Sequence, residues 1–271
     1  MSESFLRFFA LDASPFSKEI ADSDLWLPPS KQALLDELVV AVQERTQVML
    51  VGEPGAGKTC VLRALRHRLP AAGFRLTYCH NATLGRRDFY RQLSQALGLV
   101  PTATAAAVFY AVSAHVEQLG RERVHPVFLL DEAHMLHQDM LDHLHILLNY
   151  DWDSRALLSL ILVGLPELQD RLALRKNRSL YSRIEHRLSI GPMLACDTEA
   201  YVRLRLERAG VEREVFTADA LATLHEAAAS SLREIDRMAT TALREAARRK
   251  KKLVERDVMA HAVGSHDAHE R

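Results

Sequence analysis

Short segments rich in apolar residues alternate with longer amphipathic segments over the first two thirds of the chain. The short segments lie at residues 48–51, 74–79, 126–130 and 158–163. The longer ones, with apolar residues three or four positions apart, lie at 60–69, 86–97, 105–119 and 139–148. Apolar strands that alternate with such helices are typical of a parallel sheet covered on both faces. We expect a fifth strand at Ser189-Ile190.

The pattern after Gly191-Pro192 consists of helices alone. Amphipathic spacing recurs at 197–209, 217–228 and 232–249, and Asp197 and Thr217 stand where helix caps are expected. Residues 1–30 mix five aromatic side chains with three prolines. This mixture predicts an irregular arm, followed by a helix from Ser30. Packing is the favoured role of the aromatic side chains, and contact with a nucleotide base is the alternative.

Residues 52–59, with the sequence Gly-Glu-Pro-Gly-Ala-Gly-Lys-Thr, separate the first predicted strand from the first predicted helix. Glycine adopts backbone angles that let successive N–H groups turn inward around an anion. In a loop of this spacing, Lys58 reaches the β- and γ-phosphates of a nucleotide and the Thr59 hydroxyl ligates Mg²⁺. The following helix aims its N-terminus at the phosphates. The expected nucleotide-binding residues are Gly52, Glu53, Pro54, Gly55, Ala56, Gly57, Lys58, Thr59 and Cys60.

Two carboxylates, Asp131 and Glu132, end the third predicted strand. In enzymes with such a phosphate loop, the first carboxylate holds Mg²⁺ through its waters, and the metal bridges β- and γ-phosphate oxygens. The second carboxylate polarises the attacking water, so Glu132 is the candidate general base. We therefore expect a site for ATP and Mg²⁺, with Thr59 and Asp131 as the metal-binding residues.

Asp131-Glu132-Ala133-His134 is also the signature of a class of helicases. Such helicases need a second nucleotide-binding lobe with further arginine motifs. About 80 residues remain after Gly191, and their pattern is helical. This remainder leaves no room for the second lobe.

The order of these features resembles that of the AAA+ ATPases. Within that superfamily the chain looks most like the bacterial ExeA-like ATPases and the related TniB and TnsC transposition ATPases. The resemblance covers roughly residues 5–263 and is carried by Pro15-Phe16 and by residues 52–59, 131–134, 162–168 and 232–237. It implies an α/β P-loop NTPase fold, in which helices sandwich a parallel five-stranded sheet and a small all-helical lid follows.

This fold class gives the expected domain organisation. The expected parts are an N-terminal arm and helix at 1–45, the nucleotide-binding core at 46–191, the helical lid at 192–263 and a flexible tail at 264–271.

The resemblance also implies two arginines that complete the site. One acts on the ATP of a neighbouring subunit from the end of the helix before the last strand, where this chain has Arg183, with Arg187 as the alternative. A cation there neutralises charge on the transferring phosphoryl group. The other is a lid arginine that senses the γ-phosphate of its own subunit, matched here by Arg233. For both arginines the competing interpretation is an ordinary helix-surface charge.

One feature departs from the family pattern. A polar sensor residue commonly ends the fourth strand, but here Val163 is followed by Gly164-Leu165-Pro166. Asn149, in the preceding loop, is the candidate that could supply an amide in place of this residue. The sequence therefore supports nucleotide binding more directly than turnover.

Composition limits the partners. The chain has 271 residues, enough for two domains, and its 35 basic residues balance 35 acidic ones. Binding to nucleic acid must therefore come from a local patch. The candidates are Arg86, Arg87 and Arg91, or the basic run at 248–252, for which a solvated helix end is the alternative.

Cysteine spacing and hydropathy bear on the compartment. Cys60, Cys79 and Cys196 include no CxxC pair, which fits a reducing environment. No run of 18 apolar residues and no secretory signal are evident, so we expect a cytoplasmic protein without a membrane segment. Four histidines between 134 and 145 lack a metal-ligand pattern, and we expect no metal site there.

The expected function is that of an ATPase that assembles head to tail, as a ring or filament, so that Arg183 reaches the next subunit's site. Hydrolysis then ends the assembly. The expected work is on DNA, as a transposition helper that marks a target and recruits a transposase. ExeA secretion proteins usually add a transmembrane segment and a periplasmic wall-binding domain after the ATPase, and the sequence contains neither. Two alternatives stay open: a cytoplasmic ATPase of a secretion or envelope system, and a nucleotide-held switch with little turnover.

Overall fold

The computed structural model describes residues 2–17, 19–79, 85–100, 104–151 and 154–267. The chain divides into two compact units. The first, which we call the helical unit, comprises Met1–Pro28, Pro54–Gly57 and Gly191–Arg271. The second, the sheet unit, comprises Pro29–Glu53 and Lys58–Ile190.

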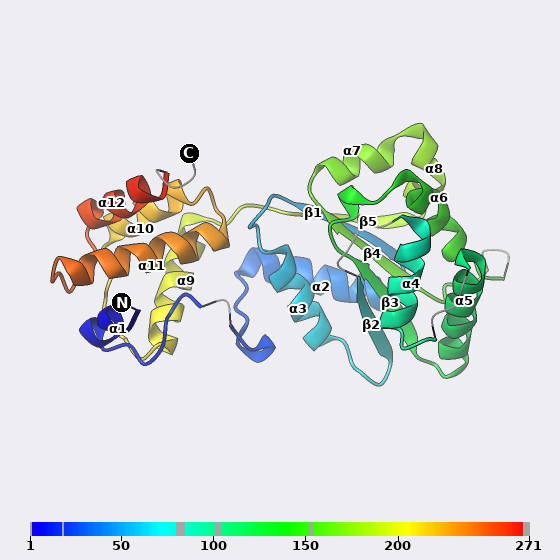
Figure 1. Ribbon diagram of the computed structural model, residues 1–271, viewed down its shortest axis with the longest axis horizontal. Coiled ribbons are helices and arrows are strands. Elements are labelled where there is room, and N and C mark those ends of the chain that lie inside the picture. The colour runs from blue at the N-terminus through cyan, green and yellow to red at the C-terminus, as the bar shows by residue number, and fades with distance from the viewer. Residues whose placement is uncertain (1, 18, 80–84, 101–103, 152–153, 268–271) are drawn as a thin grey trace. The chain divides into compact units, whose positions relative to one another are not determined.

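The sheet unit is built on five parallel strands (Figure 1). The strands are β1 (Gln47–Gly52), β2 (Phe74–Cys79), β3 (His125–Leu130), β4 (Ser159–Gly164) and β5 (Ile184–Ile190). Their order across the sheet is β2-β3-β4-β1-β5. All six residues of β3 and of β4 are buried, as expected for interior strands of a sheet covered on both faces. The predicted five-stranded fold is confirmed.

Helices cover both faces of this sheet (Figure 1). They are α2 (Pro29–Gln43), α3 (Lys58–Arg68), α4 (Arg86–Ala96), α5 (Ala105–Arg121), α6 (Gln138–Leu147), α7 (Glu167–Ala173) and α8 (Arg178–Tyr181), with the 3₁₀ turns η2 (Ala133–Met135) and η3 (Arg175–Asn177). Met49 and Val51 of β1 point to one face and enter a core with Phe89, Val112 and Leu144 of α4, α5 and α6. On the opposite face α2 and α3 pack together against β1.

The helical unit consists of short helices around their own apolar core. They are α1 (Ser2–Phe9), α9 (Ala195–Arg208), α10 (Ala218–Ala227), α11 (Leu232–Arg248) and α12 (Arg256–Asp267), with the 3₁₀ turn η1 (Asp22–Asp24). Along α11, Ile235, Ala239 and Ala242 are fully buried, at the spacing predicted for its inner face. Ser231 caps this helix, because its hydroxyl accepts the N–H of Glu234.

The N-terminal arm belongs to the helical unit. Phe5, Phe9 and Phe16 are buried in its core, so the packing role predicted for these aromatic side chains is confirmed. The buried Arg205 of α9 holds the arm through bonds to the carbonyl oxygens of Pro15 (2.5 Å) and Ser17 (2.7 Å). An arginine buried in this way satisfies two backbone acceptors that no strand or helix pairs.

Several local features differ from the sequence prediction. The first residues of the arm form the helix α1, and α12 extends to Asp267, where the sequence predicted no helix. β5 begins at Ile184, so it is longer than the predicted Ser189-Ile190. Asp197 is the third residue of α9 rather than its cap, and its carboxylate accepts the N–H of Leu194 from inside the first turn (3.1 Å). Residues 268–271 of the predicted tail lie outside the described residues.

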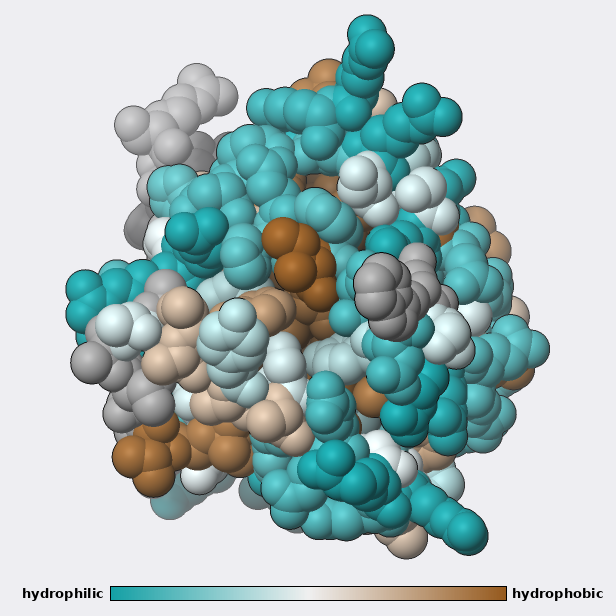
Figure 2. Space-filling model, turned by 90° about the vertical axis from the view of Figure 1, so that its right-hand side faces the viewer, coloured by the Kyte–Doolittle hydropathy of each residue, from teal (hydrophilic) through white to brown (hydrophobic). Residues whose placement is uncertain are grey.

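The side of the molecule shown in Figure 2 is largely hydrophilic, with hydrophobic side chains in small separate patches. Single exposed apolar side chains are ordinary on a protein surface, and this distribution does not by itself indicate a large hydrophobic docking face.

Candidate functional site

The phosphate loop connects β1 to α3, as its sequence predicts. Gly55 (φ +78°) and Gly57 (φ +94°) take left-handed backbone angles that side chains disfavour. These angles turn the backbone so that successive N–H groups form an anion-binding concavity. The 11-residue helix α3 begins at Lys58, so its N-terminal amides add a positive potential beside the loop.

The ammonium group of Lys58 stays over this loop. It donates to the carbonyl oxygens of Gly52 (2.6 Å) and Glu53 (3.0 Å). Thr59, the next residue, is exposed in the first turn of α3, and Cys60 is half-buried behind it. The loop thus presents a cation and a hydroxyl from adjacent positions, which are the groups that bind nucleotide phosphates and a magnesium ion.

Asp131 immediately follows β3 and is nearly buried. Its Oδ2 accepts a hydrogen bond from the Tyr78 hydroxyl (2.7 Å), and its Oδ1 accepts the N–H of Glu132 (2.9 Å). Burial and the bond to Asp131 raise the pKa of Tyr78 above its ordinary value, so the hydroxyl stays a donor at neutral pH. The sequence analysis missed Tyr78. The only signal for it was that β2 ends at the same edge of the sheet as β3.

Glu132 adopts a left-handed backbone conformation (φ +54°, ψ +34°), which is uncommon for a residue other than glycine. Its carboxylate is about half exposed, and Oε2 lies 3.5 Å from Nδ1 of His134. The general base that we expect is therefore open to solvent on one side and contacts an imidazole on the other.

Sheet topology brings the two parts of the site to one edge. β1 and β3 flank β4, and all three strands are parallel, so the phosphate loop and Asp131 both follow carboxyl ends on the same edge. Neighbouring strands lie about 4.8 Å apart, which separates the ends of β1 and β3 by about 10 Å. The residues that end β4 stand between them.

The donor set fits a magnesium ion. Mg²⁺ prefers hard oxygen ligands and keeps several of its waters. The Thr59 hydroxyl and the Asp131 carboxylate supply such oxygens. The nearly buried Asp131 carboxylate already carries two hydrogen bonds and still has acceptor capacity for a metal-bound water.

The end of β4 carries no polar side chain. The strand finishes at Gly164, and Leu165 and Pro166 lead into α7. The amide considered as a substitute, that of Asn149, follows α6 and precedes β4. The role of Asn149 as a substitute sensor stays a prediction.

The two candidate finger arginines differ in their surroundings. Arg183 lies between α8 and β5, an edge strand, and is half-buried. Arg187 lies within β5, where its guanidinium stacks 4.0 Å from the centre of the Tyr181 ring and donates to the Tyr181 carbonyl (3.2 Å). Arg187 therefore has a stacking partner in its own chain, and the assignment of the finger to Arg183, with Arg187 as the alternative, stays a prediction.

Arg233 is exposed in the first turn of α11 in the helical unit. A cation at a helix N-terminus opposes the helix dipole, and Arg237 stands one turn further on the same face. Helix stability therefore does not explain an arginine at this position. Its role as a sensor stays a prediction.

The basic run at 248–252 has internal partners. Arg248 and Arg249 donate to Glu245, Lys251 pairs with Glu255 and Asp257, and Lys252 donates to the Phe8 carbonyl. These bonds tie α11 to α12 and to the arm. Arg86, Arg87 and Arg91 lie exposed on α4, opposite its buried face, and Arg91 lies 3.9 Å from the Asp88 carboxylate.

The histidines between 134 and 145 do not converge. His143 bonds to the Tyr90 hydroxyl (3.1 Å), whereas His134 lies near Glu132. Within the described residues no group of three or more His, Cys, Asp or Glu side chains has the geometry to hold a metal ion.

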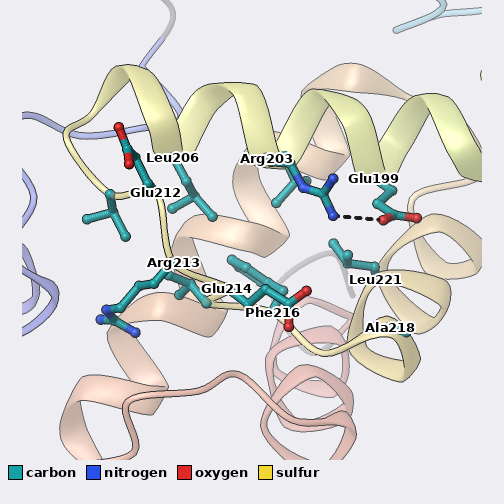
Figure 3. Close-up of a pocket in the computed structure, with 12 residues that line it drawn as sticks. Glu199, Arg203, Leu206, Glu212, Arg213, Glu214, Phe216, Ala218 and Leu221 are labelled. Atoms are coloured by element: carbon teal, nitrogen blue, oxygen red, sulfur yellow. Dashed lines mark hydrogen bonds and ion pairs between the residues drawn. The ribbon is translucent and has the colours of Figure 1, made fainter.

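A separate hollow of about 90 Å³ lies in the helical unit. Figure 3 shows it between α9, the segment 211–216 and the start of α10, with Arg203 directed to Glu199 (3.2 Å). Ligand pockets usually measure about 300 to 1,000 Å³. This hollow is too small for a nucleotide.

None of the helices in the described parts of the chain is both long and apolar enough to cross a membrane.

Comparison with known proteins agrees with this geometry. Residues 41–172 match the family model described as "AAA domain". The chain is 33% identical over 258 residues to General secretion pathway protein A of Aeromonas hydrophila. That match covers 94% of this chain and 47% of the relative, so the chain spans about half of the relative's length.

Solved structures share the fold. Cdc6p from Pyrobaculum aerophilum gives a TM-score of 0.69 at 16% identity, covering 90% of this chain and 68% of that chain. The Drosophila ORC structure bound to DNA gives a TM-score of 0.71 at 19% sequence identity, and the match covers 96% of this chain and 65% of that chain. The RuvB Holliday junction branch migration motor of Thermotoga maritima gives a TM-score of 0.60 at 14% sequence identity, and the match covers 93% of this chain and 73% of that chain.

Proposed function

We propose that this chain, which has the P-loop AAA+ fold, binds ATP and hydrolyses its γ-phosphate. The observation that supports this most directly is the placement of the phosphate loop and of Asp131-Glu132 at one edge of the sheet, on either side of the end of β4. The phosphate loop and α3 supply amides and the Lys58 cation. The carboxylates approach from β3.

Each residue then has a distinct part. The loop amides and Lys58 bind the phosphates, and Glu132 orients the attacking water and accepts its proton. Thr59 and Asp131 would hold Mg²⁺, which when bound neutralises charge on the β- and γ-phosphates. Arg183 is assigned to the ATP of an adjacent subunit and Arg233 to the γ-phosphate of its own.

The test is ATP turnover by the purified chain, alone and with DNA. The expected result is phosphate release that Glu132→Gln abolishes while nucleotide binding persists, since glutamine keeps the shape but cannot accept a proton. Release that is equal in the parent and in Glu132→Gln would contradict the proposal and would favour the nucleotide-held switch.

Head-to-tail assembly is the second part of the proposal. Arg183 precedes β5, the edge strand next to β1, and therefore stands at a border of the sheet unit where a neighbouring copy has access. Assembly with ATP, followed by dispersal after hydrolysis, is the expected cycle. Light scattering with ATP and with a non-hydrolysable analogue tests it, because only the analogue should hold the assembled state.

The proposed work of this assembly is on DNA, as a transposition helper that marks a target and recruits a transposase. Three exposed arginines on α4 form the local basic patch that a chain without net charge needs. The shared fold with an origin-recognition structure bound to DNA is consistent with this role.

DNA binding is measured over a range of salt concentrations with ATP present. Arg86→Glu and Arg87→Glu together should weaken binding and flatten its salt dependence, whereas Arg248→Glu should not, because Arg248 lies on α11 and outside the α4 patch. Absence of ATP-stimulated binding at low salt would overturn the DNA assignment.

A secretion role is the second candidate. The similarity to General secretion pathway protein A favours it. On this assignment the chain is an ATPase that acts through protein contacts in the cytoplasm, where ATP is available and the three cysteines remain unpaired. Copurification with an envelope or secretion component, together with DNA-independent turnover, would support this candidate over transposition.

A further inference from the structure

His134 occupies the space at the end of β4 where the polar sensor residue is missing. If a Cβ were built on Gly164, it would lie 3.1 Å from Cδ2 of Leu168, and 3.2 Å from both the backbone N and Nδ1 of His134. Contacts this short are tighter than ordinary van der Waals contact, so a side chain at 164 would require Leu168 and His134 to shift. The imidazole thus packs directly against the end of β4, where the chain has no side chain.

The imidazole contacts both neighbouring parts of the site. Its Nδ1 lies 3.5 Å from Oε2 of Glu132 and 3.4 Å from the backbone N of Leu165. Glu132 is the proposed general base, and Leu165 is the first residue after β4. A single ring atom thus bridges the catalytic carboxylate and the strand end that lies between the phosphate loop and Asp131.

Further bonds fix the position of this histidine. The carbonyl oxygen of His134 accepts from Arg171 of α7 (2.7 Å), and the Arg171 carbonyl accepts from the buried Asn177 (2.7 Å). The His134 side chain is only 15% exposed. The bond from Arg171 fixes the backbone at His134, and the low exposure of the side chain limits the space in which the ring can move, as a positioning group requires.

The two contacts of Nδ1 require different protonation states of this atom. It can accept from the Leu165 N–H only without a proton, and it can donate to Glu132 only with one. The position of one ring proton therefore determines whether His134 binds the strand end or the carboxylate. A change at the end of β4 that breaks the bond to Leu165 would therefore alter the contact between His134 and the Glu132 carboxylate.

We propose that His134 is a positioning residue of the ATPase site that supplies, from the β3 side, the polar contact that a sensor at the end of β4 usually makes. The inference rests on the proposed hydrolysis of ATP. It assigns to His134 the orientation of the Glu132 carboxylate and not a contact with the nucleotide.

The test compares His134→Leu, which keeps the volume, with His134→Asn, whose amide can place a polar atom near the position of Nδ1. His145→Ala serves as the matched control in the same unit. His134→Leu should lower kcat about 10- to 100-fold with nucleotide affinity within about twofold of the parent, because misplacing a catalytic group costs rate rather than binding. His134→Asn should recover most of the lost rate.

A second measurement does not depend on turnover. The ¹⁵N signal of the His134 ring is recorded in the parent and in Glu132→Gln, and loss of the carboxylate should move the Nδ1 signal. No change in that signal, or equal losses of rate in His134→Leu and His134→Asn, would overturn the inference. If the parent itself has no turnover, the proposed function fails and the ring signal alone decides whether His134 pairs with Glu132.

Discussion

The hydroxyl of Tyr78 at the end of β2 donates to Oδ2 of Asp131 at the end of β3, over 2.7 Å. The two strands are adjacent and parallel and pair residue for residue from Phe74 with His125 to Cys79 with Leu130. The carboxylate therefore has a fixed donor on the side away from β4. Partners of this kind orient a metal ligand without touching the metal.

Tyr78→Phe removes this donor and keeps the ring. We expect the variant to require more Mg²⁺, by about tenfold in the concentration for half-maximal turnover, because second-shell partners commonly contribute 10- to 100-fold to metal affinity. A Mg²⁺ titration at saturating ATP measures this. An exposed tyrosine elsewhere in the unit, Tyr110, provides the control as Tyr110→Phe. Equal titrations for both variants would mean that Tyr78 does not position Asp131.

Lys58→Ala and Glu132→Gln should separate binding from chemistry. Lys58→Ala removes the phosphate-binding cation and should abolish measurable binding of a fluorescent ATP analogue. Glu132→Gln should bind the analogue as the parent does and lose turnover by at least about 100-fold, the usual contribution of a general base. Arg121→Ala, which removes an exposed charge at the end of α5, should change neither quantity.

Arg183→Ala should spare nucleotide binding and lower turnover about 10³-fold or more, as removal of arginine fingers does. Because the finger is assigned to a neighbour's site, mixing Arg183→Ala with Lys58→Ala should restore part of the activity. In such mixtures one chain supplies the nucleotide site and the other supplies the arginine. Neither variant is active by itself.

Arg187→Ala is the matched control for this mixture, since Arg187 stacks on Tyr181 in its own chain. If Arg187→Ala loses turnover and is rescued by Lys58→Ala while Arg183→Ala remains active, the finger is Arg187.

His125 should make the sheet unit sensitive to mild acid. Burial, with a smaller effect of Arg45, lowers the pKa of His125 to about 4, and its Nε2 pairs with the Ser159 hydroxyl at 2.9 Å. The unfolded chain takes up a proton near pH 6.5, so the stabilisation is complete above that pH and is lost as the pH falls toward 4. Stability should drop by about 2 kcal/mol between pH 7 and pH 5 from this group.

Urea unfolding at pH 7 and pH 5 measures this loss. His125→Gln keeps a polar atom for Ser159 and does not titrate, so its stability should change less between the two pH values. An equal loss of unfolding free energy between pH 7 and pH 5 in the parent and the variant would show that His125 is not the titrating group.

Glu245 should stabilise the helical unit except in strong acid. Hydrogen bonds from Arg248 and Arg249 lower the pKa of Glu245 to about 2, against the opposing effect of burial. The stabilisation is therefore complete above about pH 4.5 and is lost as the pH falls through 2. Glu245→Gln should cost about 1–2 kcal/mol at pH 7, and the difference from the parent should shrink below pH 4.5. Thermal unfolding followed by circular dichroism checks the loss of stability at pH 7 and the smaller difference below pH 4.5. Glu255→Gln, at an exposed carboxylate, is the control.

Much of this architecture could be predicted because the signals are local. Residues 52–59 have a loop chemistry that few other structures require. Four strands were apparent from apolar segments, of which those of β1, β3 and β4 are buried almost throughout. The Asp131-Glu132 pair was found because an apolar strand that ends in two acids, a weak signal by itself, is a strong one when it follows such a loop in an alternating pattern of strands and helices. Each of these signals lies within a few consecutive residues.

The unpredicted parts depend on contacts between distant segments. Tyr78 reaches Asp131 only because β2 pairs with β3, and His134 meets Gly164 only because β4 lies beside β3. Helix α12 was missed because its apolar positions, among them Val258 and Ala262, are few and follow a run of charges. The arm was expected to be irregular, yet Phe5 and Phe9 fall four residues apart, on the buried side of α1.

Glu132 holds a backbone conformation that costs a residue with a Cβ about 1–2 kcal/mol. Glycine would relieve that strain, so Glu132→Gly should raise the melting temperature of the sheet unit while removing its general base. A search for more stable variants of this chain, made without regard to turnover, should therefore select the loss of this carboxylate. At position 132 the stability of the backbone and the proposed catalytic role therefore favour different residues.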